Sequence, residues 1–507
     1  MAASYERFIW KQSKPGRWER DVDEVEQFYT SLGKAYAGSG RTYFAITAHI
    51  SYTVVIEKNI DRLSTEQRIQ EALKKAWLHL RYTHPTIASW VEYDPTAKEC
   101  KKIYEGFHER NDQNSWLEDT FRIIADSKKY RTGQEFSNAD PPVPKLPTLF
   151  LVQRPISSNN IQADLVLRAH HDIIDGIGTL HFWDRLFDYA SQAYDEETCY
   201  QLPHFGDEWK NLSPPLRVAA AIPETLTSEQ TARIERTKAV NSALREKVEI
   251  ATVPLQSDAT LPGKHQRIAL KLDNEQTRRL LGACKALGAS VTHIYHAAIA
   301  VALRDAQKRS SQARSVRYIN YSLINERDHC LPPYSTPAHA VSTYHSVSGQ
   351  SLAIDLGVPA ASVPQRDQQQ QKDEFRGIIQ EIKNFYTEIR DDKEHIALAP
   401  AYWTLTALPY DPVPTPVPSP NPTPSASISS MGVIDKIIQP HRSVFELDDP
   451  WVTGEELGTG LGFFLGTFKG ELSFSVAYND VWHNLEEARG YLNRCQEIIL
   501  ECAGIAM

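Results

Sequence analysis

The sequence has few cysteines, and no two of them have the Cys-x-x-Cys spacing that a structural zinc site or a dithiol redox pair requires. The six cysteines are scattered along the chain: Cys100, Cys199, Cys284, Cys330, Cys495 and Cys502. We therefore expect reduced and mostly buried thiols, which pack as small apolar side chains, and no metal site.

Long apolar runs and long basic runs are also absent. Lys11, Lys14 and Arg17 interrupt the N-terminal residues, so we expect neither a secretory leader nor a membrane span. The formal net charge of −9 is mild for 507 residues, and it argues against a protein whose main task is to bind nucleic-acid phosphates. These absences predict a cytoplasmic protein without a membrane span and without a nucleic-acid partner.

The composition is that of an ordinary globular protein, with 41% apolar and 23% charged residues. A chain of this length exceeds what a single hydrophobic core usually serves, which favours two lobes. Residues 213–264 are polar and contain few large apolar side chains, as expected of a crossover linker. We therefore predict an N-terminal lobe at 1–212 and a C-terminal lobe at 265–507, with an extended proline-rich surface loop at 409–424.

Local patterns in the first lobe alternate strands with helices. Residues 42–56 are rich in β-branched and aromatic side chains and predict a strand. A capping-box pattern at Ser64 predicts that a helix starts there, and Pro85 ends its apolar periodicity. Residues 148–152 and 163–169 predict a hairpin, which leads directly into the most informative motif of the chain.

That motif places two adjacent histidines at the end of a strand. His170 and His171 should point to opposite faces, so one cavity receives only one of them. Asp175 lies where the strand gives way to a turn and helix, and Gly176 supplies backbone freedom for a tight geometry. A neutral imidazole, with an ordinary pKa of about 6.5, suits the removal of a proton from a substrate hydroxyl.

Two other interpretations of His171 and Asp175 are a structural pair at a strand end and a metal site. No third ligand is evident near them in the sequence, which disfavours the metal. The sequence also lacks a Gly-x-Ser-x-Gly elbow and an obvious cysteine nucleophile, so we expect no covalent acyl-enzyme.

The run from His170 to Gly176 resembles the His-His-x-x-x-Asp-Gly signature of the superfamily of chloramphenicol acetyltransferase, plant BAHD acyltransferases and nonribosomal peptide condensation domains. More narrowly, the chain is similar to fungal trichothecene 15-O-acetyltransferase-like enzymes over nearly its whole length. The segments that carry this likeness are Trp10 with Gly16-Arg17-Trp18, Ser39-Gly40-Arg41, Asn325-Glu326-Arg327-Asp328 with Pro332-Pro333, and Ser429 to Asp435.

The resemblance implies an α/β fold of two chloramphenicol-acetyltransferase-like lobes, each a mixed sheet with flanking helices, and an active-site tunnel between them. It implies that His171 is the base and that Asp175 pairs with an arginine of the second lobe, for which Arg327 is the candidate. His170 and Gly176 would support the site, and Ser430 and Gly432 would contact the acyl donor.

The implied function is an acyl-CoA-dependent O-acyltransferase that acetylates a hydroxyl of a hydrophobic secondary metabolite such as a terpenoid, without a cofactor. The Asp-Phe-Gly-Trp-Gly motif of the plant branch is absent, which disfavours that branch and leaves the donor open. One alternative is a free-standing condensation-type enzyme that takes its acyl group from a carrier protein. Another is a repurposed scaffold that binds a reactive polyketide or peptide without acyl transfer.

Overall fold

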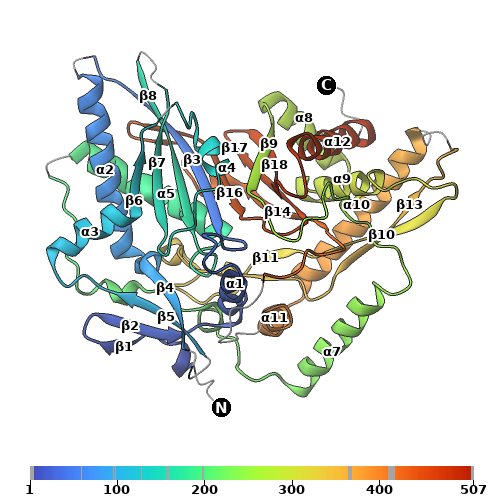
Figure 1. Ribbon diagram of the computed structural model, residues 1–507, viewed down its shortest axis with the longest axis horizontal. Coiled ribbons are helices and arrows are strands. Elements are labelled where there is room, and N and C mark those ends of the chain that lie inside the picture. Colours follow the sequence, from blue (N-terminus) through green and yellow to red (C-terminus); the bar gives the residue numbers. More distant parts are fainter. Residues whose placement is uncertain are drawn as a thin grey trace.

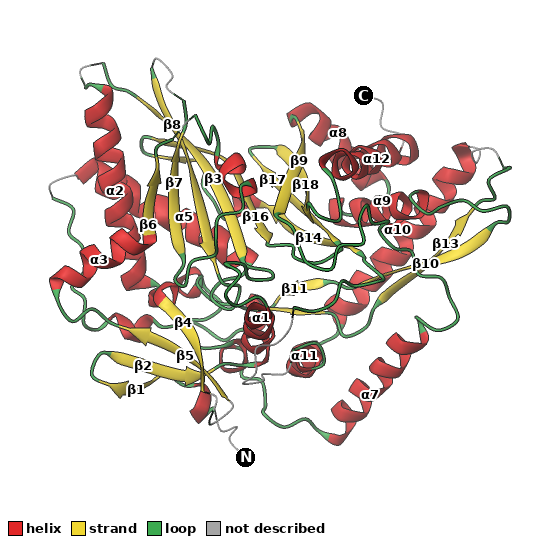
Figure 2. Cartoon of the chain, viewed as in Figure 1, coloured by secondary structure: helices red, strands yellow, loops and turns green. Residues whose placement is uncertain are grey.

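The computed structural model describes residues 5–503, except 59, 95, 97–98, 127, 156–158, 197–198, 364–367 and 409–416. Its two lobes, each built on a sheet covered by helices, lie side by side in the view of Figures 1 and 2. The mixed α/β, two-lobed architecture predicted from the sequence is confirmed.

A six-stranded sheet forms the centre of the first lobe. Its strands lie in the order β15 (His441–Arg442), β16 (Phe445–Gly454), β3 (Ile46–Val55), β8 (Asn160–Ala169), β7 (Thr148–Gln153) and β6 (Phe121–Ile124). Helices α2 (Arg62–Thr83) and α5 (Gly176–Glu196) pack against each other and bury their apolar stripes in the same core as the central strands. The predicted hairpin is confirmed, because β7 and β8 pair antiparallel.

The predicted start of the helix at Ser64 is wrong, since α2 begins at Arg62. Asp61 is the N-cap residue, and its carboxylate accepts a hydrogen bond of 3.0 Å from the backbone N–H of Ser64. The Ser64 hydroxyl instead donates to the other oxygen of Asp61, at 2.6 Å. A carboxylate one turn earlier therefore takes the capping role that the serine pattern suggested.

A four-stranded sheet forms the second lobe. Its strands lie in the order β14 (Ala426–Val433), β17 (Leu461–Phe468), β18 (Glu471–Asn479) and β9 (His265–Leu272). The helices of this lobe are α8 (Asn274–Ala286), α9 (Val291–Asp305), α10 (Gln368–Asp391) and α12 (Leu485–Ala503). Helix α9 is apolar nearly all round and packs against both α10 and α12, so it forms the middle of the second core.

The remaining elements flank the sheets or join the lobes. A separate sheet near the N-terminus has the order β1 (Lys11–Lys14), β2 (Arg17–Asp21), β5 (Glu99–Glu105) and β4 (Ser89–Asp94). Two antiparallel pairs are β10 (Arg314–Asn320) with β13 (Leu352–Val358), and β11 (Leu323–Asn325) with β12 (His345–Val347). The other helices are α1 (Glu24–Ala35), α3 (Arg110–Thr120), α4 (Gly133–Asn138), α6 (Leu216–Ala219), α7 (Ser228–Ala243) and α11 (His395–Thr404).

The sheet of the first lobe takes β15 and β16 from the C-terminal part of the chain. Strand β16 pairs antiparallel with β3, and the two core clusters therefore do not divide at one point of the sequence. Within 213–264, α7 lies outside both lobes and buries only Ile234 among its described residues (Figure 1). The lobe boundaries stay a prediction, and half of the predicted proline-rich loop, 409–416, lies outside the described residues.

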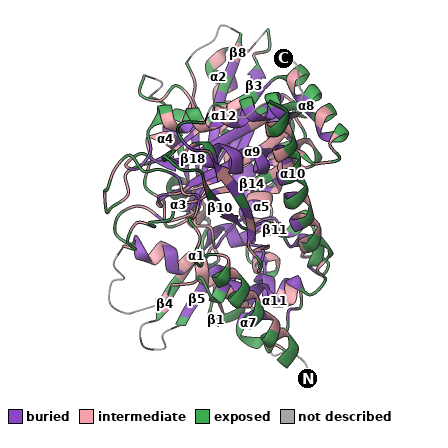
Figure 3. Ribbon diagram, turned by 90° about the vertical axis from the view of Figure 1, so that its right-hand side faces the viewer, coloured by how far each residue is buried: buried purple, intermediate pink, exposed green. Residues whose placement is uncertain are grey.

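Buried residues are concentrated in the two sheets and in α9, whereas α7 and the outer faces of α8 and α10 are exposed (Figure 3). Among the described helices, no single one is long and apolar enough to cross a membrane. Helices α8 and α9 pass that test only as a pair bent by 91°, and α9 is a core helix of the second lobe.

Candidate active site

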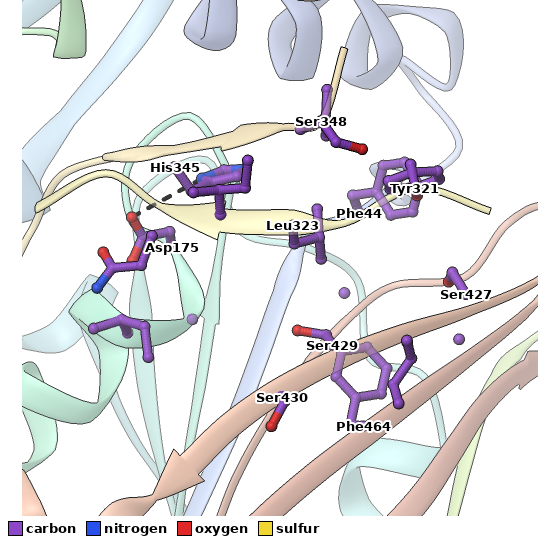
Figure 4. A pocket seen from close by; sticks show the side chains of 18 of the residues that line it. Phe44, Asp175, Tyr321, Leu323, His345, Ser348, Ser427, Ser429, Ser430 and Phe464 are labelled. Carbon is purple, nitrogen blue, oxygen red and sulfur yellow. Dashed lines mark ion pairs between the residues drawn. The ribbon is translucent and has the colours of Figure 1, made fainter. Parts of the chain in front are cut away.

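A cavity of about 800 Å³ lies between the two lobes. Its walls come from α1, the loop before α5, the β11 and β12 pair, β14, and the end of β16. In Figure 4, Asp175 and His345 lie at one side of the cavity, and Phe44 and Tyr321 lie at the other. Strand β14 carries Ser427, Ser429 and Ser430 along its edge.

The loop that carries His171 is fixed at both ends. Strand β8 ends at Ala169, opposite Ile46 of β3, and α5 begins at Gly176. Ile173 and Ile174 are fully buried in the first core, so the loop between the strand and the helix is anchored by its apolar side chains. The carbonyl of His171 accepts a hydrogen bond of 3.0 Å from the Thr343 hydroxyl, which ties this loop to the second half of the chain.

His171 lines the cavity, and His170 does not. The His171 ring stacks on Tyr29 of α1, with the ring centroids 3.9 Å apart and the planes inclined by 5°. The ring of His345 lies 5.2 Å away. Burial, together with the positive charge that His345 can carry, lowers the pKa of His171 to about 3, so the ring is neutral at pH 7.

Asp175 lines the cavity, and both oxygens of its carboxylate are hydrogen bonded to the protein. Its Oδ1 accepts from the backbone N–H of Gly178 at 2.7 Å. Its Oδ2 accepts from Arg327 Nη1 at 2.9 Å and from the backbone N–H of Tyr344 at 2.8 Å. Burial alone would raise the pKa of Asp175, but the Arg327 guanidinium and these hydrogen bonds lower it below its ordinary value. The structure thus places Arg327 beside Asp175, as the resemblance implied.

Two glycines at the start of α5, Gly176 and Gly178, lie close to the second half of the chain. Gly176 has no positive φ, so the backbone freedom expected of it is not used. A Cβ at Gly176 would lie 2.8 Å from Met431 Cε, and a Cβ at Gly178 would lie 2.2 Å from the carbonyl oxygen of Ala340. Met431 can move its flexible end, whereas the backbone oxygen of Ala340 cannot, so it is Gly178, two residues past the motif, that lets the second half of the chain approach the start of α5.

The predicted donor contacts also lie on the cavity. Ser430 and Gly432 line it from β14, and the Thr292 hydroxyl at the start of α9 donates to Ser430 Oγ at 3.1 Å. The fold therefore brings His171, Ser430 and Gly432, which are distant in sequence, to one cavity. No described residues form a cluster of three or more His, Cys, Asp or Glu side chains able to hold a metal ion.

Sequence patterns did not predict two residues that lie beside His171, namely Tyr29 and His345. Tyr29 Oη and His345 Nε2 are hydrogen bonded at 2.7 Å, and His345 Nδ1 lies 3.9 Å from Asp175 Oδ2. Burial lowers the pKa of His345 to about 4 and raises that of Tyr29 well above 10. Neither residue belongs to a short motif, and only the contact between α1, the motif loop and β12 reveals them.

The two lobes, the cavity between them and the His-His-x-x-x-Asp-Gly loop define an acyltransferase of the chloramphenicol acetyltransferase and condensation-domain type. A condensation domain of the calcium-dependent antibiotic synthetase shares the fold, with a TM-score of 0.60 at 13% identity over 96% of this chain and 97% of that one. TRI3 trichothecene 15-O-acetyltransferase from Fusarium sporotrichioides superimposes with a TM-score of 0.78 at 16% identity, covering 98% of both chains.

The family model of the 15-O-acetyltransferase Tri3 matches residues 34–386, and the chain belongs to that family. It is also similar to the acetyltransferase pigO of Monascus ruber, with 24% identity over 507 residues that cover 98% of both proteins. The protein is therefore an O-acetyltransferase, and the acyltransferase class predicted from the sequence is confirmed.

Proposed function

We propose that the protein transfers an acetyl group from acetyl-CoA to a hydroxyl of an apolar secondary metabolite such as a terpenoid, with His171 as general base. The observation that carries this proposal is a neutral imidazole that lines a cavity walled by both lobes. We place the reaction in the cytoplasm, with acetyl-CoA as a co-substrate and without a bound cofactor.

In the proposed reaction, His171 accepts the proton of the acceptor hydroxyl while the hydroxyl oxygen attacks the thioester carbonyl. The tetrahedral intermediate then collapses, the carbon–sulfur bond breaks, and the leaving thiolate takes the proton from His171. The ring is neutral again at the end of the cycle. No acyl-enzyme forms, because the thioester is already activated and the alcohol is the nucleophile.

Asp175 has an architectural role in this proposal. Its ion pair with Arg327 joins the start of α5 to the second half of the chain and so fixes the loop that carries His171. Tyr29 restricts the imidazole from one face by stacking, and it excludes water from that face. These contacts support a base whose position is set before the substrates bind.

The donor could also be an acyl group on the pantetheine arm of a carrier protein, since the fold is shared with condensation domains. Ser430 and Gly432 are proposed to contact the pantetheine part that both donors have in common. Turnover with free acetyl-CoA at low concentration would exclude the need for a carrier. A scaffold without acyl transfer would bind an apolar ligand tightly and consume no thioester.

The test is to incubate the protein with acetyl-CoA and a panel of hydroxylated fungal terpenoids, and to follow free thiol together with product mass. We expect thiol release that depends on the acceptor and is lost in His171→Ala. The melting temperature of the variant shows whether its fold is intact. Undiminished turnover by a folded His171→Ala protein would contradict the proposal.

A further inference from the structure

A buried carboxyl group with a free oxygen lies at the cavity, apart from the histidine motif. Glu456 follows β16, lines the cavity and is 8% exposed. Its Oε1 accepts from the Tyr43 hydroxyl at 2.9 Å and from the backbone N–H of Gly458 at 2.7 Å. Among the described residues, Oε2 of Glu456 has no hydrogen-bond partner. Glu456 is a buried residue that lines the cavity with one carboxyl oxygen unpartnered in the part of the chain that the structure describes, and such groups occur where a ligand completes the site. Burial raises the pKa of Glu456 to about 7, so the group is ionised above that pH.

The surroundings hold this carboxyl group in place. The backbone N–H of Glu456 donates to His265 Nδ1 at 2.9 Å, and its carbonyl accepts from Asn479 Nδ2 at 3.1 Å. A Cβ at Gly458 would lie 2.4 Å from the Tyr43 hydroxyl and 2.8 Å from Glu456 Oε1, so only glycine allows this close approach. The orientation of Glu456 is therefore fixed without a ligand.

Tyr321 is a second polar group at this side of the cavity. It lines the cavity, and its hydroxyl has no hydrogen-bond partner among the residues that the structure describes. Tyr321 is 39% exposed as a residue, but desolvation of its hydroxyl end and, after it, the negative charge of Glu456 raise the pKa of Tyr321 to about 12, so the hydroxyl keeps its proton and can donate. In Figure 4, Tyr321 lies beyond Leu323, away from Asp175 and His345.

A continuous row of aromatic rings connects His171 to Glu456. Tyr29 stacks on His171, and its ring meets Phe44 edge-on at a centroid distance of 6.4 Å. Phe44 stacks on Tyr43 at 4.1 Å, and Tyr43 is the residue that donates to Glu456. Phe44 itself lines the cavity, so the wall between the two polar ends is apolar.

The strand register gives the distance between the two ends. Gly454 of β16 is paired with Ile46 of β3, and Ile46 is paired with Ala169 of β8. Ala169 and Gly454 therefore lie two strand spacings apart, roughly 10 Å. His171 and Glu456 each follow two residues later, beyond the same edge of the sheet. A small molecule of two fused rings fits this span.

We infer that the acceptor carries a second hydroxyl at the far end of an apolar ring system, and that Glu456 accepts a hydrogen bond from it while Tyr321 donates one to it. This inference rests on the proposed function, because it assumes that the reacting hydroxyl lies at His171. It assigns Glu456 and Tyr321 to acceptor selection and gives them no part in proton transfer.

The test uses a matched pair of probes that differ in one hydrogen-bond donor, 2,6-naphthalenediol and its monomethyl ether 6-methoxy-2-naphthol. Binding to the full chain is measured by calorimetry. At about pH 8, above the pKa of Glu456 of about 7, we expect the diol to bind about 10-fold or more tightly than the ether, as for a hydrogen bond to a charged group. In Glu456→Gln the amide oxygen keeps the bonds from Tyr43 and Gly458, the NH2 group replaces Oε2, and the ratio should fall to about 1.

Two further variants distinguish a role of Glu456 and Tyr321 in acceptor selection from a purely structural role of these residues. Tyr321→Phe should weaken the binding of both probes without changing the melting temperature, because the hydroxyl oxygen and the ether oxygen can both accept from Tyr321. Tyr43→Phe, which alters the side of Glu456 away from the ligand, should leave most of the diol-to-ether ratio. Equal binding of both probes to the unchanged protein, no binding of either, or a ratio that survives Glu456→Gln would overturn the inference.

The failure of this inference and that of the proposed function are distinguishable. His171→Ala should abolish acetyl transfer and keep a diol preference that depends on Glu456. If the protein acetylates terpenoids but shows no such preference, the proposed function stands and this inference falls. If the preference is present and no thioester is consumed with any acceptor, the proposed function falls instead.

Discussion

His171 and His296 share a strongly lowered pKa and differ in their surroundings. Burial lowers the pKa of each to about 3. His296 lies inside α9, where the hydroxyls of Tyr386 and Tyr318 are hydrogen bonded to its two ring nitrogens at 3.2 and 3.1 Å. His171 instead stacks on one ring and lines the cavity, which His296 does not. A strongly lowered pKa thus marks burial in both lobes, and access to the cavity separates a candidate base from a core residue.

The largest effect should come from removing the candidate base. We expect His171→Ala to lower kcat by about 10²- to 10⁴-fold, the usual contribution of a positioned general base. The melting temperature should change little, because the ring makes few side-chain hydrogen bonds. The measurement is steady-state thiol release, with His296→Ala as the comparison. An equal loss of kcat per folded molecule in His296→Ala would contradict the assignment of His171, and not His296, as the base.

Asp175→Asn should destabilise the fold by about 3–5 kcal/mol, because it leaves the buried Arg327 guanidinium without its counter-charge. The site of His171 is held by charge, whereas His296 is held by neutral hydrogen bonds. Urea unfolding measures the loss. A double variant, Asp175→Asn with Arg327→Met, should recover part of it, and no recovery would show that the ion pair is not the cause.

His296→Ala should cost about 2–4 kcal/mol of unfolding free energy, from the cavity it leaves and from the tyrosine hydroxyls that lose a partner. The kcat per folded molecule should stay within about 2-fold of the unchanged protein, since transition-state stabilisation does not involve this residue. Urea unfolding and active-site-normalised kinetics check the two parts separately. A His296→Ala protein that loses kcat but keeps its unfolding free energy would contradict both the expected loss of stability and the expected constancy of kcat.

The two histidines should contribute alike to the pH dependence of stability. Each has a folded-state pKa below its unfolded value of about 6.5, so the unfolded chain binds more protons in acid. Their contribution is fully present above pH 6.5 and is lost as the pH falls toward their folded pKa of about 3. Replacing either one should reduce the slope of unfolding free energy against pH by up to about 1.4 kcal/mol per unit below pH 6. An unchanged slope would show that the replaced ring is not buried in its neutral form.

The smallest effect should come from Tyr29→Phe, which keeps the stack on His171 and removes the hydrogen bond to His345. We expect a loss of about 0.5–1.5 kcal/mol, a change of roughly 2- to 10-fold in kcat/KM. Tyr29→Leu, which removes the stack as well, should lower activity further. If both variants behave alike, the stacked ring does not position the base.

Local sequence patterns predicted the strands and the hairpin around His171, because their apolar alternation depends only on neighbouring residues. The start of α2 was missed, because Asp61, three residues before Ser64, is the N-cap residue and accepts from both the backbone N–H and the hydroxyl of Ser64. Arg327 was inferred through family resemblance, and its distance to Asp175 depends on how the two lobes pack. The packing of one lobe against the other leaves no pattern in the local sequence.

The same limit applies to Tyr29, His345, Tyr321 and Glu456. Tyr29 lies in α1 and His345 in β12, whereas Tyr321 and Glu456 lie outside the helices and strands. Each acquires its role from contacts across the cavity rather than from its neighbours in the chain. Glu456 in particular follows a run of ordinary strand residues and adjoins a second glutamate, Glu455, whose side chain pairs with Arg168 instead of lining the cavity. The alternation of side chains in an extended segment decides which glutamate faces the ligand.

Strand β16 has a consequence for synthesis of the protein. It covers the edge of β3, yet it leaves the ribosome only when nearly nine-tenths of the chain has been made. Until then, the edge of β3 opposite β8 keeps its backbone donors and acceptors unpaired, which is a template for pairing with another nascent chain. A shortened gene that ends after α5 would therefore give a product prone to aggregation rather than an independently folded half-enzyme.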